Sequence, residues 1–215
     1  MLPGAYRHFA QAAASTPDCL AVFARAIYVD GQSRWTYVVP LIGPEHFGPM
    51  KYDPFDWRFN FMQFNSTLIG REAIDRVGEF DPKYVHGTDW HLWWRIARTG
   101  RAGYSNEVIA AYREFGGNHT ASLFRSGGNV KEYLRVLEEV LADRPANDTS
   151  HTLSDYYAVA LQTAVRQLRK YEGDSEAYAA NLAAIRLFPS GAWNRRQRAQ
   201  YMVSRLRHGQ KSLAS

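Results

Sequence analysis

The chain has 215 residues, of which 46% are apolar and 22% charged, and it carries a net charge of +5. This composition supports a packed core and excludes a chain that is disordered throughout. No stretch approaches the roughly 18 apolar residues of a membrane-spanning helix, and no basic segment followed by an apolar block predicts a signal peptide. The single cysteine, Cys19, cannot form an internal disulfide, which favours a reducing compartment such as the cytoplasm.

The positive charge is concentrated near the C-terminus. After Glu176 the sequence contains seven Arg or Lys residues and no acidic residue, so the preceding part is slightly acidic. Nucleic-acid-binding proteins more often spread basic residues over a folded face, and no nucleic-acid partner is expected. A solvated helix, a membrane-surface contact and a protein contact all remain open for this tail.

The first part of the chain predicts a helix, a hairpin and a loop. Apolar residues at helical spacing predict a helix over 4–14. Apolar runs at 20–28 and 35–39 predict two strands, and the Asp-Gly pair that begins at Asp30 predicts the hairpin turn between them. Residues 40–56 contain four prolines and two glycines and are expected to form a long surface loop.

The rest of the chain predicts a change from mixed structure to helices alone. The elements expected before residue 125 are a buried strand near 64–68, a helix at 71–77, a helix at 90–98 and a strand at 108–112. The helices expected after it are 129–142, 153–171, 175–188 and 193–207, with a linker at 145–149. We therefore predict an α/β region at 1–125 and an all-helical extension at 126–215.

The densest set of chemically active side chains lies in HGTDWHLWWR at 86–95. A loop enters a helix at Asp89, whose carboxylate could cap the helix by accepting a backbone N–H. Held beside Trp90, the same carboxylate could also act as a general base on a hydroxyl group, and the two roles are compatible. A third interpretation is a metal site from His86, Asp89 and His91, but no regular period places all three on one face, so no metal ligands are predicted.

Four short segments follow one another in an order known from one enzyme family. They are FNSTLIGREA at 64–73, VGEFD at 77–81, TDWHLWWRIARTG at 88–100 and AYR at 111–113. The set resembles the second half of family-2 glycosyltransferases, inverting enzymes in which a Phe-Asp turn precedes a Glu-Asp pair at a helix start. The resemblance covers 1–122 and implies a partial GT-A fold, the nucleotide-diphospho-sugar transferase fold, with a small mixed sheet.

The resemblance assigns a role to each matching residue. The aspartate of the Glu-Asp pair is the catalytic base of the family, and it matches Asp89. Asp89 would deprotonate an acceptor hydroxyl, which would attack the anomeric carbon of a nucleotide sugar with inversion. His86, Thr88 and Trp90 are expected to bind the acceptor, which is a glycan or a lipid-linked molecule.

Two positions depart from the family pattern. Thr88 replaces the glutamate of the Glu-Asp pair, and Phe115 replaces the histidine of a Tyr-Arg-x-His segment. His119 lies close by in the sequence and could substitute in acceptor binding, although a loop histidine without a role is the other interpretation. Arg95 and Arg113 match arginines of the family segments and are expected to form structural ion pairs.

The donor side of the family is not recognisable in this sequence. Family members hold a divalent metal, Mg²⁺ or Mn²⁺, through an Asp-x-Asp motif, which is absent here, whereas Pro3-Gly4 resembles the stretch just downstream of it. We therefore expect an acceptor-side half, with the donor site in an N-terminal segment or in a separate donor-domain chain. The alternative is a non-catalytic remnant or accessory domain that binds a glycan or a partner.

The last predicted helix has two different faces. A helical projection separates three arginines from an apolar stripe; the arginines are Arg195, Arg198 and Arg205, and the stripe is Trp193, Ala199, Met202 and Leu206. Family-2 enzymes often use lipid-linked acceptors, so a contact of 193–211 with an anionic membrane surface is one interpretation of this helix. The alternative is that the stripe packs on the preceding helices while the arginines face water.

Overall fold

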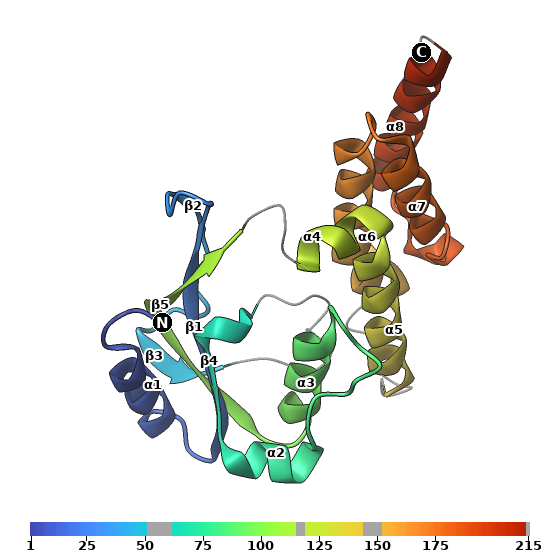
Figure 1. Ribbon diagram of the computed structural model, residues 1–215. Coiled ribbons are helices and arrows are strands. Elements are labelled where there is room, and N and C mark those ends of the chain that lie inside the picture. The colour runs from blue at the N-terminus through green and yellow to red at the C-terminus, as the bar shows by residue number, and fades with distance from the viewer. Residues whose placement is uncertain (51–61, 115–118, 144–151, 214–215) are drawn as a thin grey trace. The chain divides into compact units, whose positions relative to one another are not determined.

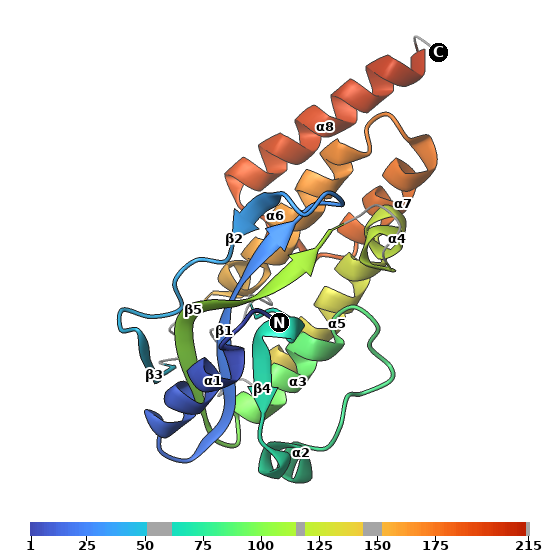
Figure 2. The same cartoon turned by 60° about the vertical axis from the view of Figure 1, so that its left-hand side comes forward.

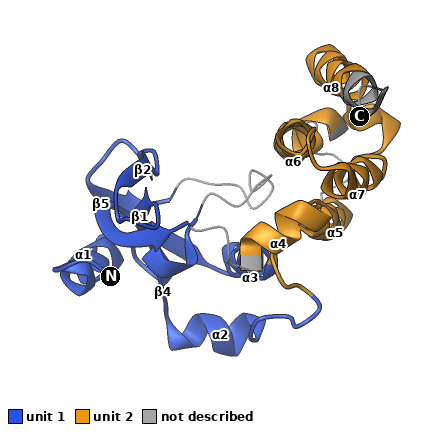
Figure 3. Ribbon diagram, turned by 45° about the horizontal axis from the view of Figure 1, so that its top comes forward, with its two compact units in different colours: residues 1–83, 88–116 blue, residues 84–87, 117–215 orange. Residues whose placement is uncertain are grey.

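The computed structural model describes residues 1–50, 62–114, 119–143 and 152–213 (Figure 1). The chain forms two compact units (Figure 3), and each is described by itself. Unit 1 comprises 1–83 and 88–116, and unit 2 comprises 84–87 and 117–215. The boundary lies before the predicted residue 125, because helix α4 (His119–Ser126) packs against helices of unit 2.

Unit 1 is built on a mixed sheet with five strands among the described residues. The central strand β1 (Cys19–Val29) pairs in parallel with β5 (Arg101–Arg113) along one edge. Its other edge is shared by β4 (Thr67–Ile69) and β2 (Trp35–Val38), both antiparallel to it. The short strand β3 (Phe47–Pro49) is antiparallel to β5 on the far side. The expectation of a small mixed sheet in an α/β fold is therefore confirmed.

Helices cover both faces of β1. Phe9 and Ala12 of α1 (Ala5–Ala14) form a core cluster with one face of the strand. Helix α3 (Thr88–Ala97) lies on the opposite side (Figure 1). There Phe23 of β1 meets Trp93 of α3 edge to face, with ring centroids 5.4 Å apart. A strand that is buried on both faces has an almost continuous run of apolar residues in its sequence, which explains the apolar run at 20–28.

The structure corrects some of the predicted elements of unit 1. The expected buried strand at 64–68 is a 3₁₀ turn (Phe64–Ser66) followed by β4, and Phe64 is 59% and Leu68 41% exposed. The reason is that β4 pairs with only Ala21, Val22 and Phe23 of β1 at an edge of the sheet, so part of β4 faces solvent. The expected loop at 40–56 contains β3, while its last residues, and the predicted linker at 145–149, lie outside the described residues.

Local signals located the other elements well. Helix α2 (Arg71–Val77) and the hairpin between β1 and β2 lie where they were predicted. The helix at 90–98 begins two residues earlier as α3, and the strand at 108–112 is the second half of the longer β5. The left-handed backbone of Gly78, with φ of 79°, ends α2 as expected of glycine.

The described part of unit 2 contains helices and connecting segments. Besides α4 these helices are α5 (Gly128–Ala142), α6 (Leu153–Lys170), α7 (Ser175–Ile185) and α8 (Arg195–Leu213). Thr152 and Asp155 form a capping box at the start of α6, and the Asp174 carboxylate accepts the N–H of Ala177 at the start of α7. None of the described helices is long and apolar enough to cross a membrane.

Candidate functional site

Asp89 is the second residue of α3, in unit 1. Its side chain is half-buried, and its Oδ1 accepts the backbone N–H of Trp90 at 2.7 Å. A carboxylate in the first helical turn also lies at the positive end of the helix dipole. Asp89 thus accepts a backbone N–H, as the capping interpretation predicted, although it is the second residue of the helix and not the residue before it. This hydrogen bond holds the carboxylate in a defined position.

The tryptophans of α3 belong to the core. Trp90 is 0% and Trp93 1% exposed, and Trp94 is buried with them. A fully buried indole cannot stack on an acceptor, so the assignment of Trp90 as an acceptor-binding residue is corrected to a core position. The physical reason is that α3 is buried on nearly every side, so its first apolar residue packs inward with the others.

The predicted acceptor-binding residues are divided between the two units. Thr88, which is half-buried, precedes Asp89 in unit 1. His86 belongs to unit 2, where its ring packs against Phe124 and Tyr133 with centroid distances of 5.5 and 5.4 Å. His119 begins α4 of unit 2, and its side chain lies outside the description. The predicted set therefore does not form one cluster within either unit.

Glu132 of α5 is the residue of this region that sequence reasoning missed. Its Oε2 accepts the backbone N–H groups of Val85, His86 and Gly87 at 2.9, 2.5 and 2.9 Å, and the residue is only 8% exposed. Three successive N–H groups directed at one oxygen form a nest for an anion, here filled by a side chain of unit 2 itself. The sequence did contain a signal for this residue. Glu132 lies four positions before Val136 and therefore on the same, buried face of an amphipathic helix, where a carboxylate needs a partner.

A second residue of α5 holds the same segment. The hydroxyl of Tyr84 donates to Oε1 of Glu139 at 2.7 Å. Residues 84–87, which directly precede Thr88 in the chain, are therefore fixed to α5 at both ends. This arrangement gives the backbone leading to Asp89 a defined conformation.

The two arginines predicted to be structural bind backbone carbonyl groups. Arg95 donates to the carbonyls of Val77 and Glu79 at 2.6 and 2.5 Å, where α2 ends. Arg113 donates to the carbonyl of Asp30 at 3.1 Å in the β1–β2 turn. Hydrogen bonds from the Arg34 backbone, with a further effect of the Arg113 charge, lower the pKa of the Asp30 carboxyl.

We expect Arg95→Ala to lower the free energy of unfolding of unit 1 by about 2 kcal/mol, because two hydrogen bonds from a charged group to the end of α2 are lost. Urea unfolding followed by tryptophan fluorescence measures the change. Arg71→Ala, at an exposed position at the start of α2, is the control and should stay within about 0.5 kcal/mol of wild type. Equal stability of the two variants would contradict the capping role of Arg95.

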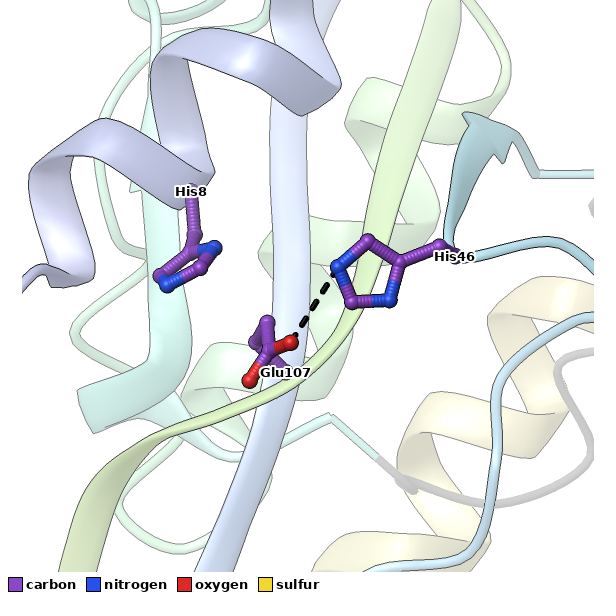
Figure 4. Close-up of side chains that lie close together, drawn as sticks. All are labelled: His8, His46 and Glu107. Atoms are coloured by element: carbon purple, nitrogen blue, oxygen red, sulfur yellow. Dashed lines mark ion pairs between the residues drawn. The ribbon is translucent and has the colours of Figure 1, made fainter.

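One group of side chains in the described part of the chain is arranged like metal ligands. It consists of His8, His46 and Glu107 of unit 1, whose potential ligand atoms lie within 4.8 Å of one another (Figure 4). The lone cysteine is less suited to chemistry: burial raises the pKa of the Cys19 thiol, and its Sγ donates to the carbonyl of Ala21. The cysteine is therefore not an activated nucleophile.

No family model, curated protein or solved structure matches this chain.

Proposed function

We propose that the chain is the acceptor-side part of an inverting, family-2-like glycosyltransferase with a partial GT-A fold, in which Asp89 is the general base. The observation that supports this most is the placement of Asp89: a half-buried carboxylate held by a backbone hydrogen bond at the start of a core helix. A general base must first be held within hydrogen-bond reach of the proton that it removes, and only then does its pKa decide how well it works. The segments around Asp89 are also those that resemble the family.

In the proposed reaction, an Asp89 carboxylate oxygen takes the proton of the acceptor hydroxyl. The hydroxyl oxygen forms a bond to the anomeric carbon of the nucleotide sugar, and the bond from that carbon to the diphosphate breaks on the opposite face. The configuration is inverted, and the diphosphate keeps the bonding electrons. Thr88, beside Asp89 in the chain, is the residue of unit 1 that we propose to contact the acceptor.

The divalent metal implied by the resemblance does not fit the residues of this chain. Mg²⁺ and Mn²⁺ prefer oxygen ligands, whereas the sequence has no Asp-x-Asp and the cluster found among the described residues contains two imidazoles. No step is assigned to such a metal. The nucleotide sugar would be bound by a donor domain outside these 215 residues or by a separate chain in the cytoplasm.

Helix α8 bears on the nature of the acceptor, because its apolar stripe faces solvent. The helix packs against α6 within unit 2 (Figure 2). Two polar side chains hold it there: Gln197 donates to the carbonyl of Ala158 at 2.9 Å, and Ser204 donates to Glu172 at 3.0 Å. Met202 is 62% and Leu206 68% exposed. The alternative that the stripe packs on the preceding helices is therefore wrong for Ala199, Met202 and Leu206, the residues of the stripe that lie in α8, whereas Trp193 is half-buried.

The exposed face of α8 has the pattern of a membrane-surface helix. At 3.6 residues per turn its apolar residues form one strip that has arginines along both borders. The strip is Ala199, Met202, Val203 and Leu206, and the bordering residues are Arg196, Arg198, Arg205 and Arg207. Because no acidic residue follows Glu176, we propose an anionic membrane surface as the partner and a lipid-linked molecule as the acceptor.

We expect the wild-type chain to co-sediment with phosphatidylglycerol vesicles at low salt and to be released by high salt. Arg198→Gln combined with Arg205→Gln should weaken binding roughly 30-fold, since each arginine contributes about 1 kcal/mol near an anionic surface. Arg71→Gln combined with Arg101→Gln, at exposed positions of unit 1, is the matched control. Absence of binding at low salt, or equal loss in both double variants, would contradict the membrane role of α8.

A second candidate function is favoured by an aromatic row on the sheet. The ring of Tyr28 lies 5.5 Å from that of Tyr37 and 5.1 Å from that of Tyr112, across three neighbouring strands. Tyr37 is 52% and its neighbour Trp35 74% exposed. Exposed rings of this kind suit stacking on apolar sugar faces. A non-catalytic glycan-binding accessory domain is therefore the alternative.

An add-back assay tests the proposed enzyme function. It retains the cell components that would bind the nucleotide sugar and removes only this chain. Membranes and extract are prepared from cells lacking this chain, radiolabelled nucleotide sugars are supplied, and the purified chain is added. We expect the chain to restore incorporation of label into lipid-linked material. If no labelled sugar is incorporated into any product after add-back, the glycosyltransferase proposal fails.

A further inference from the structure

We infer that His8, His46 and Glu107 form a binding site for a divalent transition-metal ion of the zinc class. The three side chains come from α1, from the segment before β3 and from β5 (Figure 4). All three elements belong to unit 1. The site does not depend on the proposed glycosyltransferase function, whose metal would need oxygen ligands.

The ligand set and the spacing suit zinc. Two imidazoles and one carboxylate, with one position left to water, are a common set in zinc sites that stay open. Metal–ligand bonds of about 2.0–2.1 Å in a tetrahedron place ligand atoms roughly 3.3 Å apart. Nε2 of His46 and Oε1 of Glu107 are already 3.1 Å apart, and the farthest pair of ligand atoms is within 4.8 Å. Small side-chain rotations of His8 would complete the set.

Neighbouring residues hold His46 beside Glu107. Asn106 donates its side-chain amide to the carbonyls of Gly43 and Glu45 at 2.7 and 2.6 Å, and its backbone N–H to the carbonyl of His46 at 2.9 Å. Asn106 directly precedes Glu107 in β5, so the loop that carries His46 is fastened next to the carboxylate. Such surrounding hydrogen bonds orient the ligands of metal sites.

His8 is placed from the other side by the core of unit 1. Its neighbour Phe9 is 1% exposed, and the backbone N–H of Leu2 donates to the carbonyl of Ile109 in β5 at 2.6 Å. The ring of Phe47 packs against both His8 and His46, with centroids 6.1 and 4.3 Å away. The two imidazoles are therefore oriented by one aromatic ring before any ion binds.

His8 also has an unmet bonding capacity. Its Nδ1 is buried and has no hydrogen-bond partner among the residues that the structure describes. A simple ion pair would need only His46 and Glu107, which are 57% and 39% exposed, and would leave His8 without a role. A bound cation accounts for all three side chains and leaves an open coordination position toward water.

The test uses the full chain without a histidine tag and Zn²⁺ as the probe. Isothermal titration calorimetry should show one Zn²⁺ per chain, and Co²⁺ should give the visible absorption of a tetrahedral site. His8→Ala, His46→Ala and Glu107→Gln should each weaken Zn²⁺ binding at least 10-fold, since each removes a ligand. Glu114→Gln, at an exposed position outside the cluster, should bind as wild type does.

Two outcomes would overturn the site. The first is binding that survives in the combined variant of His8, His46 and Glu107, because the ion would then be held elsewhere. The second is a wild-type chain that does not bind Zn²⁺ at all. Since Glu107→Gln keeps the size and shape of the side chain, its far-ultraviolet circular dichroism should match wild type, and its loss of binding then reports a lost ligand rather than lost folding. Zn²⁺ should also raise the melting temperature of wild type but not of this variant.

Discussion

Asp89→Asn is expected to lower the restored incorporation of sugar in the add-back assay by at least about 100-fold. The asparagine keeps a side-chain oxygen that can accept the N–H of Trp90, so the start of α3 and the fold are preserved. Its amide cannot take a proton from an acceptor hydroxyl near neutral pH, so the chemical step loses its base. The measurement is the rate of label incorporation at saturating donor and acceptor.

The matched control is Asp75→Asn, a change of the same kind on the exposed face of α2. This variant should restore incorporation as well as wild type does. If Asp89→Asn also restores it fully, Asp89 has only its helix-terminal role, and the chain acts as a binding module. Under the second candidate function, Trp35→Ala would then be the variant that fails to restore incorporation, because it removes the exposed ring that neighbours Tyr37 of the aromatic row.

The elements that sequence predicted well are those that local signals determine. The hairpin follows from the turn at Asp30, whose carboxylate accepts N–H groups of Gln32 and Arg34. The starts of α6 and α7 follow from Thr152 and Asp174, which cap them with their own side chains. Each signal lies within a few residues of the structure it determines, so no knowledge of the tertiary fold is needed.

The errors came from contacts between residues far apart in sequence. The stripe of α8 was identified only in part: Trp193 precedes the helix, and at 3.6 residues per turn Arg195 falls inside the stripe and not apart from it. The docking face of α8 is set by Gln197 and Ser204, whose partners lie in or just after α6. Trp90 looked like a pocket residue because it follows Asp89, yet the packing of α3 buries it completely. A periodic pattern shows that a face is apolar or polar, but not what covers it.

The candidate metal ligands could not be found from spacing. His8, His46 and Glu107 are separated by 38 and 61 positions, whereas metal motifs are recognisable when their ligands are a few residues apart. They meet only because α1 packs on β5 and because Asn106 fastens the loop that carries His46. The site is thus a product of sheet topology, which the alternation of apolar residues does not specify.

Glu132→Ala is expected to have the largest effect on stability, lowering the free energy of unfolding of unit 2 by about 3–5 kcal/mol. The change removes the acceptor of three backbone N–H groups, at Val85, His86 and Gly87, in a place where Glu132 itself is only 8% exposed. A buried donor left without a partner costs about 1–3 kcal/mol, and the N–H of Gly87 is buried while those of Val85 and His86 are partly buried. Glu132→Gln retains an oxygen acceptor without its charge and should cost about 1–2 kcal/mol.

Amide hydrogen exchange measures the effect at the groups concerned. The N–H groups of His86 and Gly87 should be protected in wild type and exchange at least 100-fold faster in Glu132→Ala, because a loss of about 3 kcal/mol corresponds to more than a hundredfold change in the opening equilibrium. Glu138→Ala, at an exposed position of the same helix, should leave this protection unchanged. Unchanged exchange in Glu132→Ala would mean that these three donors do not depend on the carboxylate. A loss in Glu132→Gln would measure the contribution of the charge, which both variants remove, and the additional loss in Glu132→Ala would measure that of the oxygen acceptor.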